Sequence, residues 1–348
     1  MDSLHQRRKL NTAHGKLETP LLFPVRNVGK RHKDNTPEYT SEIPELGVGM
    51  VNARAIREHD DLWGSIHSGS TLRSEMGVPE DTILFADSGG FDFRDGGVSL
   101  DTTPEETLET QRRIGADIYG TVDIPLSTDR RNKVNNERIS ENIEHALTAS
   151  DKHEGDALLY ASVHGYNPDT VRNGIHYLEE HGDFDGYALG SLVPIRTDYE
   201  RVTKVILAAR RATEKPLHVY GLGGIVYQPL LLYLGVDTFD STSFIRSAGK
   251  RNYLVPGFGG TELHTIESLD RLPCACPVCG ARSLDEVRAK RSLLTRHNLW
   301  ALVTELRRFR YMIESEQDIE SYLDLRFEGN SVTKRAYRLA KQQVRGLT

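Results

Sequence analysis

Three aspartates in this chain each close a short segment with the composition of a buried strand. The segments are Gly235–Asp240, Thr82–Asp87 and Ile118–Asp123. A carboxylate at the end of a single strand could cap a helix or form a turn. Three of them suggest a shared pocket, because parallel strands bring their carboxyl ends to one face of a barrel or sheet, where active sites collect. Carboxylates in such a pocket can act as nucleophiles or as acid–base groups.

The cysteines form a second candidate site. All three lie within Cys274–Cys279, and His297 follows eighteen residues after the last of them. An odd number of thiols in a chain without secretory features argues against disulfides. Three thiolates and one imidazole match a closed tetrahedral metal site, which leaves no position for substrate. We therefore predict one structural zinc per chain on Cys274, Cys276, Cys279 and His297, an ordinary surface histidine being the alternative for His297.

Eight strand patterns alternate with helical patterns and would position these residues. The strands are expected at Thr19–Val25, Gly47–Asn52, Thr82–Asp87, Ile118–Asp123, Leu158–Val163, Gly186–Gly190, Pro216–Gly221 and Gly235–Ser243. This count is typical of an α/β fold of the (β/α)₈ TIM-barrel type, and a doubly wound open sheet is the alternative. We expect a barrel catalytic domain over residues 1–255. A zinc-binding, basic helical subdomain over 256–348 would pack on it, with one long helix from Ser283 to about Glu314.

Composition and charge limit the class of protein. The chain has 348 residues, 38% of them hydrophobic, which suffices for one large domain or a domain with an appendage. No apolar run of eighteen residues occurs and the first residues lack a signal-peptide core, so we expect a cytoplasmic protein without membrane contact. The net charge is −6, yet residues 282–348 carry 14 Lys and Arg against 9 Asp and Glu. Such a basic end suits nucleic-acid contact, and a solvated helical surface equally.

Several other polar residues fall at predicted strand ends. Asp87 is followed by Ser88 and two glycines, which allow a sharp loop and close approach of the backbone to a ligand, although an Asx turn is the plainer interpretation. The segment Gly186–Leu192 offers backbone amides suited to a flat polar heterocycle, or forms a simple tight turn. His164 and His218 also lie at or within strands, and for His218 we favour a hydrogen-bonded core histidine.

Several of these motifs, taken in order, resemble the guanine transglycosylase family, whose members exchange guanine in tRNA for a 7-deazaguanine. The likeness covers most of residues 15–300 and is closer to the archaeal branch. The motifs are Gly15–Val25, Asp87–Phe91, Val122–Pro125, Phe184–Gly190, Pro216–Gly221, Gly235–Asp240 and the cysteines.

The resemblance implies roles for the aspartates. Asp240 matches the nucleophile that forms a covalent glycosyl-enzyme, Asp87 the acid/base, and Asp123 the carboxylate that grips the base. A carboxylate can displace a glycosidic leaving group while a second carboxyl group manages the proton. The remaining substrate-binding positions implied near the base are Ser88, Asp92, His164, Gly190 and Ser191.

Two of these positions depart from the family's usual residues. Asp92 and His164 stand where the family usually has glutamine. Some phage, viral and genomic-island relatives act on DNA, so we expect 7-deazaguanine insertion into DNA, with tRNA as the alternative. The resemblance also implies a homodimer. Two further alternatives are a barrel hydrolase holding divalent metal on the strand-end carboxylates and a catalytically silent accessory subunit.

Overall fold

A ring of eight parallel strands lies at the centre of the computed structural model, which describes residues 4, 6–26, 43, 47–90, 102–128, 132–255, 262–328 and 331–346. The ring consists of β3 (Leu21–Pro24), β4 (Val48–Asn52), β5 (Ile83–Asp87), β6 (Ile118–Gly120), β7 (Leu158–His164), β8 (Gly186–Gly190), β9 (Leu217–Val219) and β10 (Thr238–Ser241). From β4 to β10 each strand pairs with the next in sequence, and β10 pairs with β3. A single bridge between Val25 and Met50 joins β3 to β4. The predicted TIM-type barrel is confirmed, and the open doubly wound sheet is wrong.

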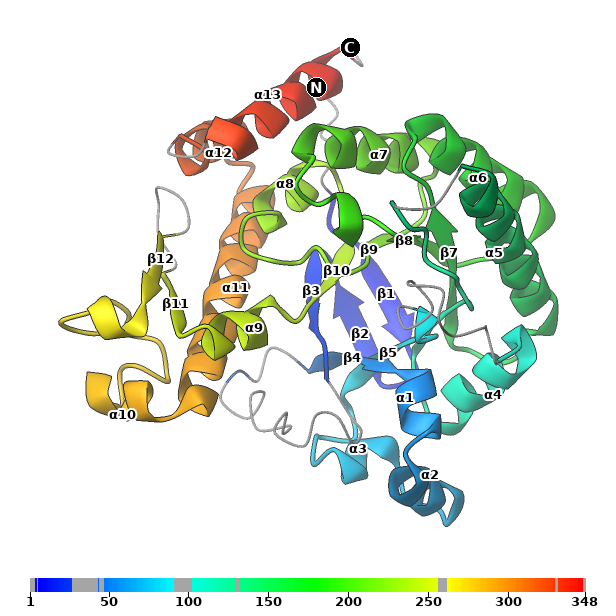
Figure 1. The fold of residues 1–348 in the computed structure, drawn as a ribbon, viewed down its shortest axis with the longest axis horizontal. Coiled ribbons are helices and arrows are strands. Elements are labelled where there is room, and N and C mark those ends of the chain that lie inside the picture. Colours follow the sequence, from blue (N-terminus) through cyan, green and yellow to red (C-terminus); the bar gives the residue numbers. More distant parts are fainter. Residues whose placement is uncertain are drawn as a thin grey trace.

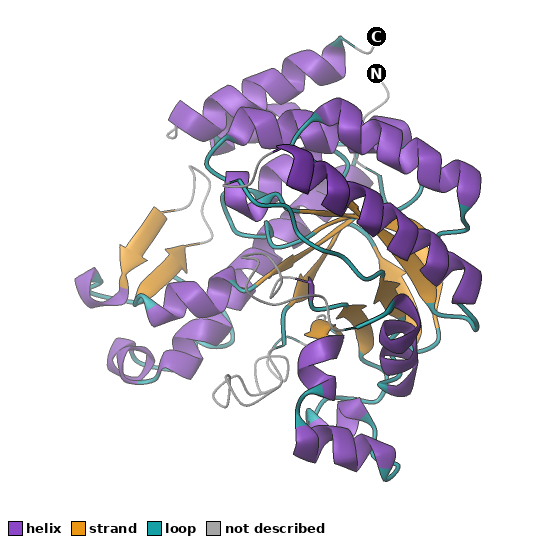
Figure 2. Ribbon diagram, turned by 45° about the vertical axis from the view of Figure 1, so that its right-hand side comes forward, coloured by secondary structure: helices purple, strands orange, loops and turns teal. Residues whose placement is uncertain are grey.

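Buried apolar residues explain why these short segments form strands. Every residue of β8 is buried, as are all but the first of β7. Strands covered on both faces are typical of parallel sheets enclosed by helices. Figures 1 and 2 show the helices as an outer layer around the strands. They are α1 (Ala53–Arg57), α2 (Asp60–His67), α3 (Leu72–Glu75), α4 (Pro104–Arg113), α5 (Asn132–Lys152), α6 (Pro168–His181), α7 (Tyr199–Ala212), α8 (Gln228–Tyr233) and α9 (Ser243–Gly249).

A hairpin of β1 (Lys9–Thr12) and β2 (Gly15–Glu18), which the sequence patterns did not predict, lies at the amino-terminal end of the barrel. His14 in its turn contacts Asp117, the residue before β6, at 2.8 Å. Arg8 next to the hairpin donates to Asp237, the residue before β10, at 2.8 Å. These contacts leave the opposite end, where the candidate carboxylates lie, for chemistry.

The carboxyl-terminal part contains β11 (Asn252–Val255), β12 (Glu262–Thr265), α10 (Leu284–Ala289), α11 (Arg291–Glu314), α12 (Ile319–Arg326) and α13 (Ser331–Arg345). The single helix expected over residues 283–314 is wrong, because extended backbone at Lys290 (φ −120°, ψ 106°) separates α10 from α11. Arg288 donates to the backbone carbonyls of Ile266 and Glu267, so α10 is held against the segment that follows β12.

Two hydrophobic clusters divide this part of the molecule. Residues of α11, α12 and α13, including Leu302 and Tyr337, belong to the same buried cluster as the barrel. A smaller cluster surrounds the cysteines and includes Tyr253, Val287 and Leu294. The domain boundary at residues 255/256 stays a prediction.

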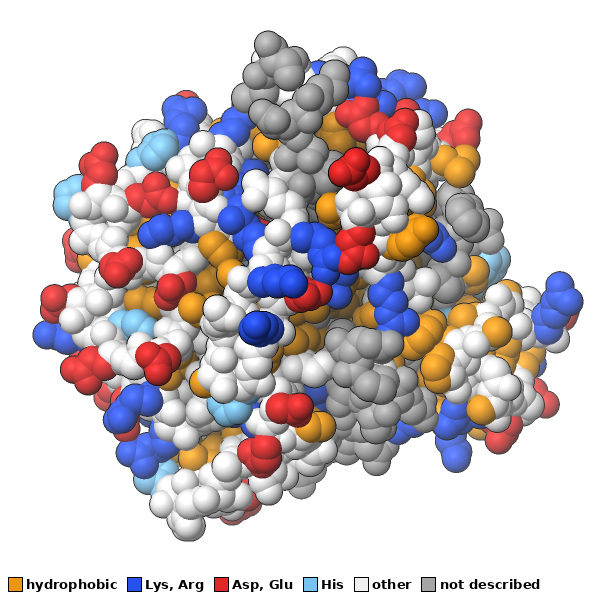
Figure 3. All heavy atoms as spheres, turned by 180° about the vertical axis from the view of Figure 1, so that it is seen from behind, with side chains coloured by type: hydrophobic (Ala, Val, Ile, Leu, Met, Phe, Trp, Pro, Cys, Tyr) orange, Lys and Arg blue, Asp and Glu red, His pale blue; other side chains and the backbone are white. Residues whose placement is uncertain are grey.

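Some basic residues of the carboxyl-terminal helices are engaged within the protein. Arg310 donates to the carbonyl of Glu18 at 2.6 Å, and Lys341 and Arg345 both pair with Glu320. On the face opposite to that of Figure 1, side chains of both signs are interspersed over the described residues (Figure 3). Part of the basic excess of residues 282–348 is therefore used in contacts within the protein. None of the described helices has the length and apolar content needed to cross a bilayer.

Candidate active site and metal centre

Asp240 is held at one of its two carboxylate oxygens. It lies within β10, one residue before the strand ends, and is 7% exposed. The Gly221 N–H donates to Oδ1 at 2.7 Å, and His218 Nε2 lies 3.4 Å from the same oxygen. Among the described residues, no hydrogen bond to Oδ2 is formed. That oxygen is available to a ligand.

Asp87 is the last residue of β5, and its surroundings favour the protonated carboxyl group. It keeps some exposure to solvent, but burial of its carboxyl group among the strand ends raises its pKa well above the usual value. The negative charges of Asp123 and Asp240 raise this pKa further, while hydrogen bonds from the backbone of Gly89 and Ser88 oppose the shift. The three carboxyl groups therefore share one electrostatic environment, in which Asp87 favours the protonated form.

Asp123 lies three residues beyond β6 rather than at its end. Ser88 accepts a hydrogen bond from the Gly90 N–H at 3.3 Å and donates its own hydrogen to Asp123 Oδ1 at 2.7 Å. A side chain at Gly90 would place its Cβ 2.2 Å from the Asp123 carbonyl oxygen. Glycine is required at position 90 because the two loops touch there.

His164 at the end of β7 connects Asp123 to the loop after β8. The Leu126 N–H donates to Ser191 Oγ at 2.7 Å, so the Ser191 hydroxyl can give its hydrogen to His164 Nδ1, 2.8 Å away. Because Nδ1 is then an acceptor, the neutral ring carries its hydrogen on Nε2. Nε2 lies 3.1 Å from Asp123 Oδ2, although its geometry is not that of a hydrogen bond. Ser88 thus orients Oδ1 of Asp123, and His164 lies against Oδ2.

The loop after β8 approaches this network closely. A Cβ on Gly190 would lie 2.3 Å from His164 Cε1, so only glycine fits beside the ring. Ser191 has a left-handed backbone (φ 62°), which is strained for a residue with a side chain. Strain of this kind collects at functional sites. Gly190 and Ser191 thus belong to the same group of contacting residues as His164 and Asp123.

Two residues at this site were not assigned a role from the sequence. Tyr220 follows β9, and its pKa is raised well above the usual value by burial and by the charges of Asp87, Asp123 and Asp240. Its hydroxyl therefore lies within electrostatic reach of all three carboxyl groups. His218 is hydrogen-bonded in the core as expected, but it also contacts Asp240. The sequence pattern that could have pointed to Tyr220 and His218 was the position of Pro216–Gly221 at a predicted strand end. Asp92 lies outside the described residues.

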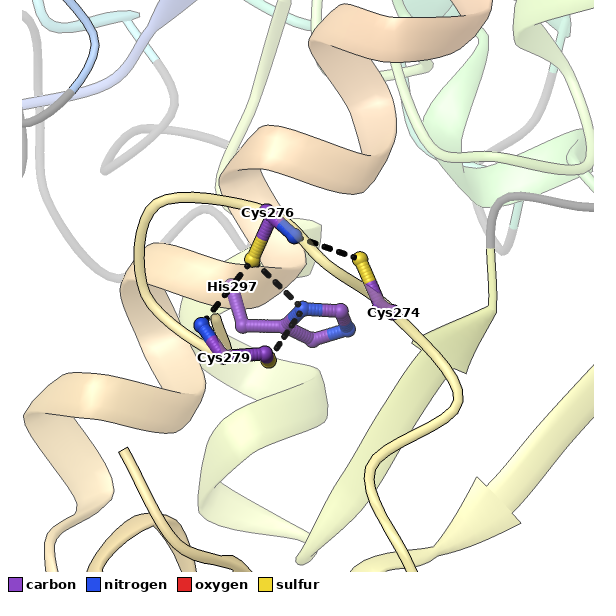
Figure 4. A group of neighbouring side chains, drawn as sticks. All are labelled: Cys274, Cys276, Cys279 and His297. Atoms are coloured by element: carbon purple, nitrogen blue, oxygen red, sulfur yellow. Dashed lines mark hydrogen bonds between the residues drawn. The ribbon is translucent and has the colours of Figure 1, made fainter. Parts of the chain in front are cut away.

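The cysteine cluster comprises Cys274, Cys276, Cys279 and His297, whose candidate ligand atoms all lie within 4.8 Å of one another (Figure 4). His297 Nδ1 lies 3.5 Å from Cys276 Sγ and 3.3 Å from Cys279 Sγ. The other ring nitrogen, Nε2, lies 2.8 Å from the carbonyl oxygen of Leu254, to which it donates. That bond leaves Nδ1 without a hydrogen and directed at the thiols, as metal ligation requires.

This donor set fits a metal ion. The Cys276 N–H donates to Cys274 Sγ at 3.4 Å and the Cys279 N–H to Cys276 Sγ at 3.3 Å, contacts that favour thiolates. Tyr253 stacks on His297 with centroids 3.7 Å apart. Within the described residues, this is the one group of three or more His, Cys, Asp and Glu side chains with atoms close enough to hold an ion. The strand-end carboxylates do not form another, which gives the metallohydrolase alternative no support.

The two sites differ in what they can do. The cysteine cluster joins the segment after β12 to α11 and presents four ligands, as structural metal sites do. The barrel site combines a carboxylate with one available oxygen and a carboxyl group that favours its protonated form. Such a pair can displace a leaving group and give it a proton.

Comparison with known proteins identifies relatives over most of the chain. A family model described as "Queuine tRNA-ribosyltransferase" matches residues 3–328. The tRNA-guanine(15) transglycosylase of Aeropyrum pernix is 31% identical over 319 residues, 88% of this chain and 59% of that protein. The protein of the same name from Methanosarcina acetivorans is 30% identical over 321 residues, 90% of this chain and 63% of its own. The protein of this name from Haloferax volcanii is 32% identical over 314 residues, which are 85% of this chain and 57% of that protein. The chain thus spans about 60% of the length of these relatives.

Proposed function

This chain belongs to the guanine transglycosylase family, and from that premise we propose that it exchanges guanine in tRNA for a 7-deazaguanine base. The observation that carries the proposal is the pairing of Asp240, which has one oxygen available, with Asp87, whose raised pKa favours the protonated form. Members of this family are glycosyltransferases. A double displacement needs both of these groups in one pocket.

In the proposed reaction, Asp240 attacks the anomeric carbon of the nucleotide. The bond from this carbon to guanine breaks, its electron pair leaves with the base, and Asp87 gives the base a proton. A covalent ester between Asp240 and the sugar results. The incoming base then loses a proton to Asp87 and displaces Asp240, which restores both groups.

Asp123 is proposed to bind the base. Ser88 holds its Oδ1 and His164 lies against its Oδ2, which leaves further lone pairs of both oxygens for a ligand. Guanine presents a ring N–H and an amino group side by side, and a carboxylate can accept from both. Gly190 and Ser191 supply backbone groups next to the same pocket, and Asp92 stays a predicted contact.

The relatives support tRNA better than the DNA substrate that the sequence favoured. Each of the three compared proteins carries the name tRNA-guanine(15) transglycosylase. A paired base must leave its stack to reach a pocket at the end of a barrel, in either polymer. We therefore propose tRNA as the polymer. The homodimer also stays a prediction.

An exchange assay tests the proposed function. The protein is incubated with radiolabelled guanine and either unmodified tRNA or double-stranded DNA, and acid-precipitable label is counted. We expect incorporation into tRNA. Incorporation into DNA alone would overturn the choice of polymer. If folded, metal-loaded protein incorporated label into neither polymer, the proposed exchange would be overturned. That second outcome is the one expected of a catalytically silent accessory subunit.

Replacing Asp87 by asparagine should slow formation of the covalent adduct by about 10²- to 10⁴-fold, because the amide cannot protonate the departing guanine. A group with a raised pKa is protonated below that pKa and loses its proton above it. The wild-type rate of adduct formation should therefore fall as the pH rises through the raised pKa of Asp87.

Single-turnover rates measured across a pH series test this role of Asp87. The Asp87→Asn variant should lose the descending limb that the wild-type protein has. Asp156→Asn, at an exposed residue, provides the matched control and should keep the wild-type profile. A variant at position 87 with the wild-type rate and profile would remove Asp87 from the proton transfer.

A further inference from the structure

His218 is a buried imidazole for which the reaction described above has no use. It lies in β9 with its side chain 0% exposed. Its ring packs against Phe85 at a centroid distance of 4.7 Å, Tyr220 at 4.9 Å and Phe23 at 6.2 Å. Burial lowers the pKa of His218, although the neighbouring Asp240 opposes this shift. The aromatic surroundings favour a neutral ring, which has one donor and one acceptor nitrogen.

Both ring nitrogens of His218 have a polar partner. Nδ1 lies 2.9 Å from the Thr238 hydroxyl, and Nε2 lies 3.4 Å from Asp240 Oδ1. An ionised carboxylate only accepts hydrogen bonds, whereas a hydroxyl can donate. The arrangement that satisfies all three groups has Thr238 donating to Nδ1 and the Nε2 hydrogen directed at Asp240. Thr238 and Asp240 lie on the same face of β10, two residues apart, so the strand sets this geometry.

The two oxygens of Asp240 are consequently unequal. Oδ1 receives the Gly221 N–H at 2.7 Å and faces His218 Nε2. No described residue donates to Oδ2. A carboxylate held at one oxygen presents the other in a fixed direction.

We propose that Thr238 and His218 form a positioning pair that holds Asp240 Oδ1 as an acceptor, so that Oδ2 is the atom that attacks the anomeric carbon. This inference rests on the proposed function. As the bond from Oδ2 to the sugar carbon forms, the base leaves with the electron pair of its own bond. Oδ1 becomes the carbonyl oxygen of the ester and keeps its two N–H neighbours. When the incoming base attacks, the electron pair of the ester bond returns to Oδ2, and the N–H groups stabilise the restored carboxylate. His218 neither gains nor loses a proton.

Substitutions at both residues test the pair through the rate of adduct formation on tRNA in a single turnover. Thr238→Val removes the hydroxyl while keeping a β-branched side chain of similar size. We expect this variant and His218→Phe each to be roughly 10- to 100-fold slower, since a hydrogen bond to a charged group is lost. His218→Gln, whose amide can donate, should recover part of the rate. The double variant should be no slower than His218→Phe, because Thr238 acts through the histidine.

A matched control and a readout independent of activity separate positioning from folding. Thr203 is also fully buried and donates to the Tyr199 carbonyl within α7, so Thr203→Val should keep the wild-type rate. Nitrogen-15 NMR of labelled histidine should find the hydrogen of His218 on Nε2 in the wild-type protein and a shifted tautomer population in Thr238→Val. A hydrogen on Nδ1, or a wild-type rate for Thr238→Val, would overturn the pair alone. A wild-type protein that forms no adduct would refute the proposed function and, with it, the attack by Oδ2.

Discussion

Asp240→Ala should abolish guanine exchange and the covalent adduct together, with a loss of at least ~10⁴-fold in the exchange rate. The expected loss is large because the substitution removes the attacking oxygen itself, while the proposed roles of Asp87 and Asp123 are to transfer the proton and to bind the base. His218 faces Asp240 with a nitrogen that we assign as a donor. Tyr220 lies in surroundings that raise its pKa, so its hydroxyl is a poor nucleophile. Without the carboxylate the site retains only groups that bind the base and move its proton.

The adduct is measured by trapping labelled tRNA on the protein in a denaturing gel, in the presence of a guanine analogue that stalls the second step. Asp240→Asn tests the charge at nearly constant shape and should behave as the alanine variant does. Asp151→Ala, at an exposed residue of α5, is the control and should trap normally. An adduct that persists in Asp240→Asn would assign the nucleophile to another residue.

The barrel could be predicted because its signals are local. Each strand is a short apolar run followed by polar residues. Helix α4 begins with Pro104 directly after Thr103, and Thr103 and Glu106 form a capping box there. The break at Lys290 had no such signal, since neither glycine nor proline stands there. It depends on contacts between Arg288 and the segment after β12, which are distant in sequence.

The sequence allowed us to predict which carboxylates belong to the candidate site, but not the raised pKa of Asp87 or the contact between His218 and Asp240. Parallel strands necessarily bring their ends together, so Asp87 and Asp240 could be grouped from the sequence alone. That Asp87 favours the proton depends on the burial of its carboxyl group and on the charges of Asp123 and Asp240. The contact between His218 and Asp240 depends on the register of β9 against β10, in which His218 pairs with Thr238. No pattern in one strand specifies that register.

Replacing a residue of the cysteine cluster should also have a large effect, on metal content and local stability. Cys276→Ser should release the metal and unfold the segment that carries it. The ligands and their neighbours make up most of a separate small core with Tyr253, Val287 and Leu294. Structural zinc contributes about 10–16 kcal/mol of apparent binding energy in small zinc-finger peptides. Part of such an energy should be lost here, while the barrel and α11–α13 keep their own larger core. We expect one zinc per wild-type chain by elemental analysis, and much less than one in the variant.

Limited proteolysis distinguishes local unfolding from global unfolding. Cleavage of Cys276→Ser should begin within residues 262–290, while the barrel retains its circular dichroism signal. Tyr253→Phe gives a graded comparison, since it removes the hydroxyl 3.2 Å from Cys279 Sγ but keeps the ring that stacks on His297. This variant should keep its metal and lose less stability than Cys276→Ser, because it removes a hydrogen-bond partner of the ligand Cys279 and leaves all four ligands in place. If Cys276→Ser held a full equivalent of zinc and resisted protease as the wild type does, the four residues would not be the ligands. The link between the segment after β12 and α11 would then depend on apolar packing alone.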